Sequence, residues 1–163
     1  MADGAASWQE WYDQYHRPLL LFARQIVASP SDAEDALQQG FVRFWKSRQS
    51  ARDSAAYLFA CVRSAALDAR RARLSRLRHE SQAAAQTPLL AGPPDLEDRR
   101  ALLEAAIAQL PADQREVLVL KLWSDLTFAQ IAEALAIPTG TAASRYRSAL
   151  ERLHTLLSPE VTP

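Results

Sequence analysis

The chain has 163 residues, of which 48% are hydrophobic and 23% are charged, and its 19 Lys and Arg residues balance its 19 Asp and Glu residues. This is the composition of a folded globular protein, and the zero net charge excludes a wholly basic nucleic-acid binder of the histone kind. The single cysteine, Cys61, excludes an internal disulfide framework and a cysteine-rich zinc site. No apolar run approaches the roughly 20 residues of a membrane span, and the N-terminus lacks the order of a signal peptide. We therefore expect a cytoplasmic protein without membrane insertion.

Helix-forming residues dominate the chain, and glycine occurs only four times. The sequence predicts an all-α fold made of two small helical domains, residues 1–80 and 95–163. Between them lies the segment 81–94 (SQAAAQTPLLAGPP), which has three prolines, one glycine and no charge. Such a composition is typical of a flexible linker.

The first predicted domain begins with aromatic residues at spacings of three and four, which predict a helix, a kink near Pro18 and a second helix. The best-defined helix of this domain is predicted over Ser31–Lys46, where Ser31 and Glu34 have the spacing of a capping box. Its apolar residues share one face, and the opposite face is polar and rich in amides. A solvated helix face would show the same pattern.

A polar loop, Ser47–Ser54, precedes a long helix whose second half carries arginine at 70, 71, 73, 76 and 78. These cations outnumber the acids beside them in the sequence, so we expect them to bind phosphates and release counterions. The competing interpretation is a soluble helix end that is rich in arginine. Cys61 falls on the apolar side of this helix, which predicts a buried, unreactive thiol.

In the second predicted domain, a helix over Arg99–Leu110 precedes a helix that Pro111 opens. Thr127 and Gln130 have the spacing of a second capping box, and a tight break at residues 136–138 separates a short helix from a longer one over Thr139–Leu157. The residues expected to face the core are Leu118, Val119 and Leu122, then Ile131, Ala132 and Leu135, and finally Ala142, Tyr146, Ala149, Leu150 and Leu153.

A short helix, a tight break and a longer helix form the helix-turn-helix pattern, whose second helix enters the major groove of DNA with its N-terminal residues. Hydroxyl and guanidinium groups suit contacts with phosphates and base edges. The candidate residues for such contacts are Thr139, Gly140, Thr141, Ser144, Arg145 and Arg147. A helical hairpin with a solvated second helix would produce the same pattern.

Taken together, these segments resemble the extracytoplasmic-function (ECF) sigma factors, the small alternative sigma subunits of bacterial RNA polymerase. In the first domain the resemblance lies in AEDALQQGFVRFW (33–45) and YLFACVRSAALDARR (57–71). In the second domain it lies in LPADQREVL (110–118), TFAQIAE (127–133) and PTGTAASR (138–145). The chain departs from the family pattern at Gln39, where an acid is usual, at Ser64, where asparagine is usual, at Ala69, where a larger apolar residue is usual, and at Ala143, which is often lysine.

The resemblance implies an alternative sigma factor that is not an enzyme, needs no cofactor, and acts with core RNA polymerase and promoter DNA, with an anti-sigma factor as a further partner. It places core-polymerase contacts at Asp35, Gln38, Gln39, Phe41 and Val42. It places contacts with the single-stranded −10 element at Arg48, Arg52, Arg63, Ser64, Asp68, Arg70 and Arg71. The duplex −35 element would be read by the six helix-turn-helix residues named above.

Two other functions stay open from the sequence. One is a helix-turn-helix regulator that binds DNA without polymerase, which would need an effector pocket or a dimerisation helix. The other is a helical adaptor, which would require the basic helix and the turn motif to be coincidental. His16, His79 and His154 are isolated in the sequence, and no catalytic or metal-ligating cluster accompanies them.

Overall fold

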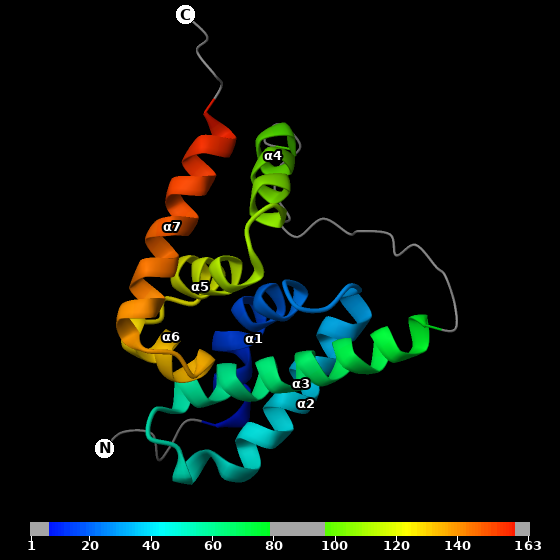
Figure 1. The fold of residues 1–163 in the computed structure, drawn as a ribbon. Helices are drawn as coiled ribbons and strands as arrows, with labels where there is room; N and C mark the ends of the chain where they lie inside the picture. Colours follow the sequence, from blue (N-terminus) through cyan, green and yellow to red (C-terminus); the bar gives the residue numbers. More distant parts are fainter. Residues whose placement is uncertain (1–6, 79–96, 159–163) are drawn as a thin grey trace, which may run out of the picture.

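The computed structural model describes residues 7–78 and 97–158, and every regular element within them is helical (Figure 1). The first half of the chain forms α1 (Trp8–Arg24), α2 (Pro30–Ser47), a 3₁₀ turn (Arg48–Ser50) and α3 (Ser54–Leu77). The second half forms α4 (Glu97–Ala108), α5 (Ala112–Trp123), α6 (Phe128–Leu135) and α7 (Thr139–Leu157). The all-α prediction is confirmed. The predicted linker 81–94 and His79 lie outside the described residues.

Helix α1 is one helix that contains Pro18, so the prediction of two helices here was wrong. Proline has no N–H to donate to the carbonyl one turn earlier, and inside a helix it costs about 3 kcal/mol. Leu19 and Phe22, which follow Pro18, are completely buried. Burial of each such side chain stabilises the fold by about 1.5–3 kcal/mol, so the packing of the second half of α1 outweighs the cost of the proline.

Helix α2 begins at Pro30, and its N-cap is Ser29, whose hydroxyl accepts a hydrogen bond from the N–H of Asp32 at 3.1 Å. The predicted capping box at Ser31 and Glu34 was therefore wrong. Proline is preorganised for the first position of a helix, and this preference moves the start of α2 to the serine before it. The apolar face is buried as predicted, through Ala33, Ala36, Leu37, Gly40, Phe41 and Phe44.

Helices α2 and α3 approach each other closely at Gly40. A Cβ atom built on Gly40 would lie 2.5 Å from Cγ2 and 2.6 Å from Cα of Val62 on α3. Real Cβ atoms do not approach other atoms so closely, so only glycine fits at this crossing. The absence of a side chain at Gly40 therefore sets the distance between the two helices that carry most of the first-half candidate residues.

The helix-turn-helix of the second half forms as the sequence predicts. The Thr127 hydroxyl accepts from the N–H of Gln130 at 3.1 Å, and Gln130 Oε1 accepts from the N–H of Thr127 at 2.9 Å. Ala136 ends α6 in the left-handed conformation with φ of 55°, and Pro138 is the N-cap of α7. The capping box, the tight break and the bounds of the last helix are thus confirmed.

Two of the leucines that were predicted to face the core lie on the surface. Leu122 on α5 is 50% exposed and Leu150 on α7 is 39% exposed. Helix α5 packs against both α7 and α1, so its four consecutive residues 117–120 are buried on two sides. This two-sided burial differs from the single apolar stripe that the prediction assumed, and it leaves Leu122 outside both contacts.

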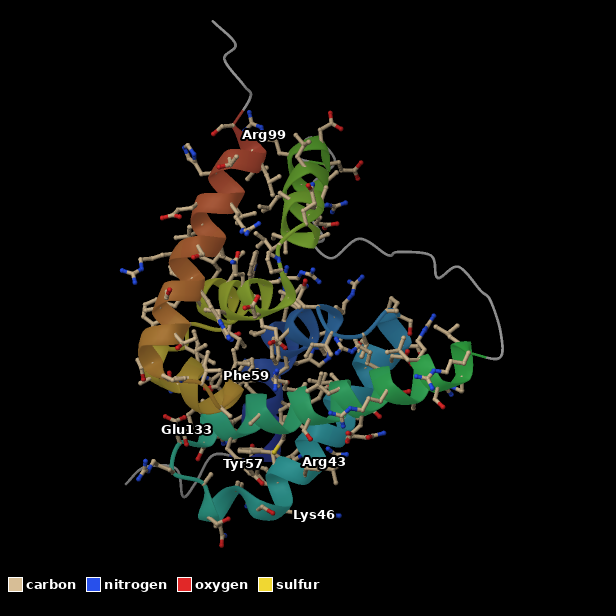
Figure 2. The ribbon with its side chains drawn as sticks, in the orientation of Figure 1. Arg43, Lys46, Tyr57, Phe59, Arg99 and Glu133 are labelled. Carbon is tan, nitrogen blue, oxygen red and sulfur yellow. The ribbon has the colours of Figure 1, made fainter. Side chains whose placement is uncertain are left out.

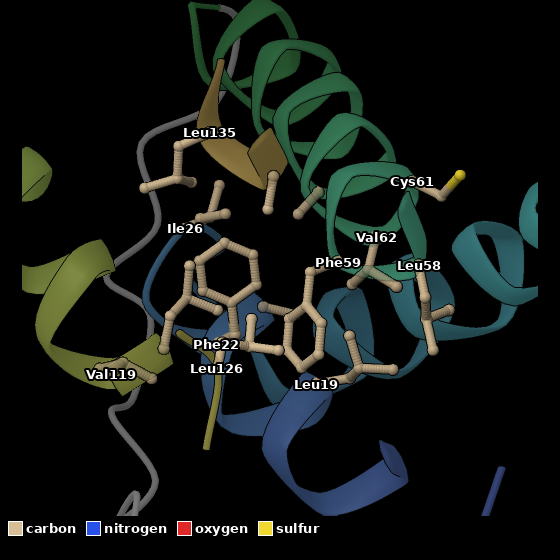
Figure 3. Packing of buried hydrophobic residues seen from close by; sticks show 14 of the residues in the cluster. Leu19, Phe22, Ile26, Leu58, Phe59, Cys61, Val62, Val119, Leu126 and Leu135 are labelled. Carbon is tan, nitrogen blue, oxygen red and sulfur yellow. The ribbon is translucent and has the colours of Figure 1, made fainter. Parts of the chain in front are cut away.

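The two halves share one hydrophobic core. Helix α6 packs on α3, and α5 packs on α1. Figure 3 shows Phe22 and Ile26 of the first half together with Val119, Leu126 and Leu135 of the second half. A smaller cluster within the second half joins α4, α5 and α7. The two predicted domains therefore lie directly against each other in this structure.

Candidate nucleic-acid and partner interfaces

Neither half of the chain covers the outer face of α2. Asp35, Gln38, Gln39 and Val42 are all exposed, and Val42 is an apolar side chain amid the polar ones. In Figure 2, Arg43 and Lys46 project from the same helix, away from α5 and α7. The structure thus brings four of the five candidate polymerase contacts together on one accessible surface.

Phe41, the fifth candidate, is only 1% exposed. Its ring packs against Trp8 and Tyr12 of α1, with centroid separations of 5.7 Å and 5.3 Å. A side chain enclosed in this way has no surface to offer a partner. We therefore remove Phe41 from the candidate contacts and assign it to the packing of α2 on α1.

At the end of α2, Arg48 is fixed in place by its neighbour Trp45. Its guanidinium carbon lies 3.6 Å from the centre of the indole ring, and the guanidinium also donates to the Trp45 carbonyl. Arg52, in the loop before α3, is exposed. This end of the helix pair therefore presents a cation held on an aromatic ring, and Arg52 supplies an exposed cation in the loop that follows.

Two of the candidate −10 residues, Ser64 and Asp68, are linked by Arg43 of α2. Arg43 Nη2 donates to Asp68 Oδ2 at 3.3 Å, and Arg43 Nη1 donates to the Ser64 hydroxyl at 3.4 Å. Arg71 pairs with Asp68 at 3.6 Å. Sequence reasoning missed Arg43, because nothing local couples α2 to residues more than twenty positions away on α3.

Arg63 lies on the side of α3 that faces the second half of the chain. Its Nε donates to Glu116 Oε1 at 3.1 Å, and its Nη2 donates to Glu116 Oε2 at 3.4 Å. The side chains of this pair are 30% and 14% exposed. The candidate −10 residues thus do not form one patch, because Arg63 is separated from Ser64 and Asp68 and is already engaged.

Some arginines at the end of α3 have acidic partners from elsewhere in the fold. Arg73 pairs with Asp32 of α2 at 3.2 Å. Among the described residues, the structure gives Arg70, Arg76 and Arg78 no acidic partner. A cationic surface therefore remains at this end, although it is smaller than the arginine count in the sequence indicates.

The first turns of α7 are accessible. Thr139, Gly140, Ser144 and Arg147 are exposed, and nothing lies within 4 Å of a Cβ atom built on Gly140. Arg145 differs from them because it pairs with Asp113 of α5 at 3.4 Å. The start of α7 is therefore accessible, whereas Arg145 is engaged by Asp113.

Cys61 is 7% exposed, which confirms the predicted burial. Burial raises the pKa of its thiol, so the thiol stays protonated near neutral pH and is a weak nucleophile. Within residues 7–78 and 97–158, no cluster of His, Cys, Asp and Glu could hold a metal ion. None of the described helices is both long and apolar enough to cross a membrane.

Comparison with known proteins relates these features to a family. Residues 11–76 match the family model of Sigma-70 region 2, and residues 100–153 match that of Sigma-70 region 4. The chain is 30% identical over 159 residues to the ECF RNA polymerase sigma factor SigL of Mycobacterium tuberculosis, with 94% of this chain and 90% of that protein covered. The chain belongs to the ECF sigma factors. As an alternative sigma factor, it binds core RNA polymerase and directs promoter recognition and transcription initiation.

Other relatives agree with this sigma factor in sequence and fold. The RNA polymerase sigma-E factor of Streptomyces avermitilis is 31% identical over 159 residues, with 94% of this chain and 87% of that protein covered. Sigma factor RpoE of Bartonella quintana, solved with the anti-sigma factor NepR, superposes with a TM-score of 0.68 at 25% identity and covers 93% of this chain and 99% of its own. CnrH, solved with the cytosolic domain of CnrY, has a TM-score of 0.65 at 22% identity, covers 92% of this chain and 86% of its own, and shares the fold.

Proposed function

We propose that this ECF sigma factor divides its work between its predicted domains. Residues 1–80 bind core polymerase and the −10 element, residues 95–163 bind the −35 element, and residues 81–94 connect them. It works in the cytoplasm, where the polymerase is, and without catalytic chemistry of its own. The observation that carries the proposal is the outer face of α2, which stays uncovered while the inner face of the same helix is buried.

The polymerase contact is proposed at Asp35, Gln38, Gln39 and Val42. Amide groups on such a face can form hydrogen bonds with a partner without the large desolvation cost of buried charges. Val42, at 51% exposed, adds apolar area that a partner can cover. This combination of apolar area and uncharged hydrogen-bonding groups fits a stable protein interface better than a purely solvated face.

Introducing a cation on this face tests the proposal. Asp35→Arg and Gln38→Arg should each weaken the binding of core polymerase by about 5- to 30-fold, because each places a large cation at the centre of the interface. The measurement is a fluorescence titration of labelled sigma factor with core, with helicity checked by circular dichroism. Asp13→Arg makes the charge change of Asp35→Arg on the exposed side of α1 and should bind as the parent does. Parent-like affinity in both α2 variants would contradict the proposed contact.

The −10 contact is proposed at Arg48, Arg52, Arg63, Ser64, Asp68, Arg70 and Arg71. The cations supply a track for the single-stranded backbone, and the Trp45–Arg48 pair lies beside that track. Asp68, held by Arg43 and Arg71, can accept a hydrogen bond from the amino group of an unpaired base.

The −35 contact is proposed at Thr139, Gly140, Thr141, Ser144, Arg145 and Arg147. Backbone N–H groups at the exposed start of α7 add an anion-binding site for a phosphate of the duplex. Ala143 can supply neither charge nor a hydrogen bond, so the two arginines provide the cations near these turns.

Arg145→Ala should weaken promoter binding by the full-length holoenzyme by about 5- to 150-fold if the side chain reads a guanine edge, which corresponds to about 1–3 kcal/mol. The loss should then be confined to promoters with the cognate −35 sequence. Arg152→Ala removes the same charge from an exposed position further along α7 and serves as the matched control. Equal losses on cognate and scrambled −35 sequences would show that Arg145 contacts only phosphate.

We also propose that an anti-sigma factor controls this chain. Sigma factor RpoE of Bartonella quintana, which shares the fold of this chain, is bound in its solved structure to the anti-sigma factor NepR.

A further inference from the structure

Arg43 of α2 reaches across to α3 and holds two side chains there. Its Nη1 donates to the Ser64 hydroxyl at 3.4 Å, and its Nη2 donates to Asp68 Oδ2 at 3.3 Å. Ser64 and Asp68 are four positions apart on α3, so they lie on one face of that helix. One planar guanidinium therefore spans both acceptors and sets their positions relative to each other.

The close crossing of α2 and α3 explains why Arg43 can reach this pair. Gly40 lies one turn before Arg43 on α2, and the absence of a side chain there lets the backbone of Val62 approach. Figure 2 shows Arg43 close to the crossing of the two helices, with Lys46 further along α2. The packing that brings the helices together thus also places the guanidinium against α3.

The contacts of Arg43 contribute little to the stability of the fold. The side chains of Arg43 and Asp68 are 43% and 51% exposed, and water and salt screen ion pairs of this kind. Arg71 pairs with the other carboxylate oxygen, Asp68 Oδ1, at 3.6 Å, and Ser64 is exposed as well. The network therefore orients accessible polar groups more than it stabilises the helices that carry them.

The hydrogen bonds from Arg43 decide what each side chain can offer to a base. The Ser64 oxygen already accepts from Arg43, so its hydroxyl hydrogen is available to an acceptor outside the protein. Asp68 is an acceptor only, and two arginines offset its charge. The pair thus presents a donor beside an acceptor. Cytosine presents the complement, an amino group beside a ring nitrogen, whereas thymine places a keto oxygen in the position of the amino group.

We propose that Arg43 is a positioning residue for promoter recognition, which holds Ser64 and Asp68 so that they select an unpaired base with an amino group over one with a keto oxygen. Arg43 acts through these two side chains and does not itself contact the base. The proposal rests on the −10 role proposed above for Ser64 and Asp68. Without Arg43, the Asp68 side chain is free to take other rotamers, and Arg71 alone offsets its charge beside the DNA backbone.

Base preference in a promoter that is already melted tests the proposal. Full-length holoenzyme is titrated with promoter fragments whose −10 segment is unpaired, and each non-template position carries either cytosine or thymine. The parent should bind cytosine about 10-fold more tightly at one position, and Arg43→Gln should reduce that ratio to about 2-fold. Lys46→Gln removes the same charge from an exposed position of the same helix and should keep the parent ratio. Urea denaturation should give nearly the same midpoint for all three proteins.

A double-mutant cycle determines whether Arg43 acts through Asp68. Asp68→Asn should abolish the preference, because an amide can donate to a keto oxygen as well as accept from an amino group. Arg43→Gln added to Asp68→Asn should then change the ratio no further. A merely structural role of Arg43 would instead change the ratio by the same factor in both backgrounds.

The remaining outcomes separate the positioning role from the −10 role on which it rests. Loss of the preference in Asp68→Asn but not in Arg43→Gln would overturn the positioning role and leave the −10 role of Asp68 standing. Absence of the preference in the parent, or its persistence in Asp68→Asn, would overturn both. Equal weakening on cytosine and thymine by Arg43→Gln, with a smaller salt slope, would show that Arg43 contacts phosphate instead.

Discussion

Gly40→Ala should lower the free energy of unfolding of this sigma factor by about 3 kcal/mol, the largest effect we expect from a single methyl group in the chain. The new Cβ would lie 2.5 Å from Val62 Cγ2 and 2.6 Å from Val62 Cα. The Cα atom belongs to the backbone of α3 and cannot rotate away, so the two helices must move apart. The gain in helix propensity, about 1 kcal/mol, offsets only part of this cost. Urea denaturation followed by circular dichroism measures the difference.

Gly140→Ala is the matched control, because the same change is made where nothing lies within 4 Å of the new atom. Position 140 is in the first turn of α7 and is exposed, so alanine should stabilise the chain by about 0.5–1 kcal/mol. Because Gly140 belongs to the proposed −35 contacts, stability is the appropriate measurement for this variant. Equal stabilities of the two variants would contradict the close crossing of α2 and α3.

Features that depend on residues three or four positions apart were predictable from the sequence. The capping box of Thr127 and Gln130, the break before Pro138 and the bounds of α7 all follow from local signals, and the structure confirms them. The prediction of the residue at which α2 begins was wrong because two local signals compete there. Ser31 has the spacing of a capping box, but Pro30 favours the first helical position and selects Ser29 as the cap.

Features that depend on contacts between distant residues were not predictable from the same patterns. The arginines of α3 outnumber the acids beside them in sequence, which led to the expectation that they are unpaired. Asp32 and Glu116 reach two of those arginines from other helices. Asp113 likewise pairs with Arg145 across the second half. No periodicity specifies such pairs, because they depend on how helices are placed in space.

The candidate site shows the same division. The accessible start of α7 and the exposed face of α2 follow from amphipathic periodicity, whereas the burial of Phe41 depends on where α1 packs.

The packing of the two halves on each other also decides whether DNA binding should be measured on a single half or on the full-length chain. An isolated second half would expose Val119, Leu126 and Leu135, which are buried against the first half, so −35 binding is best measured in the full-length chain.

Arg70→Ala combined with Arg71→Ala should reduce the formation of open promoter complexes roughly 10- to 100-fold at low salt. Arg70 is exposed and has no acidic partner among the described residues. Arg71 is 76% exposed and only 3.6 Å from Asp68, so solvent screens that pair and a phosphate can replace it. Loss of two phosphate contacts with single-stranded DNA should also reduce the slope of log K against log salt by about 1.4.

A second double variant distinguishes a direct contact with DNA phosphate from a general effect of positive charge. Arg76→Ala combined with Arg78→Ala removes two exposed cations from the same end of the molecule, beyond the proposed −10 contacts. It should reduce complex formation less and leave the salt slope closer to that of the parent. The measurement is permanganate footprinting of holoenzyme on a promoter across a series of salt concentrations. A direct phosphate contact depends on the position of the arginine, whereas the electrostatic potential of the surface depends on the total charge. Equal losses of complex formation and equal salt slopes in the two double variants would therefore mean that the end of α3 acts only through its electrostatic potential.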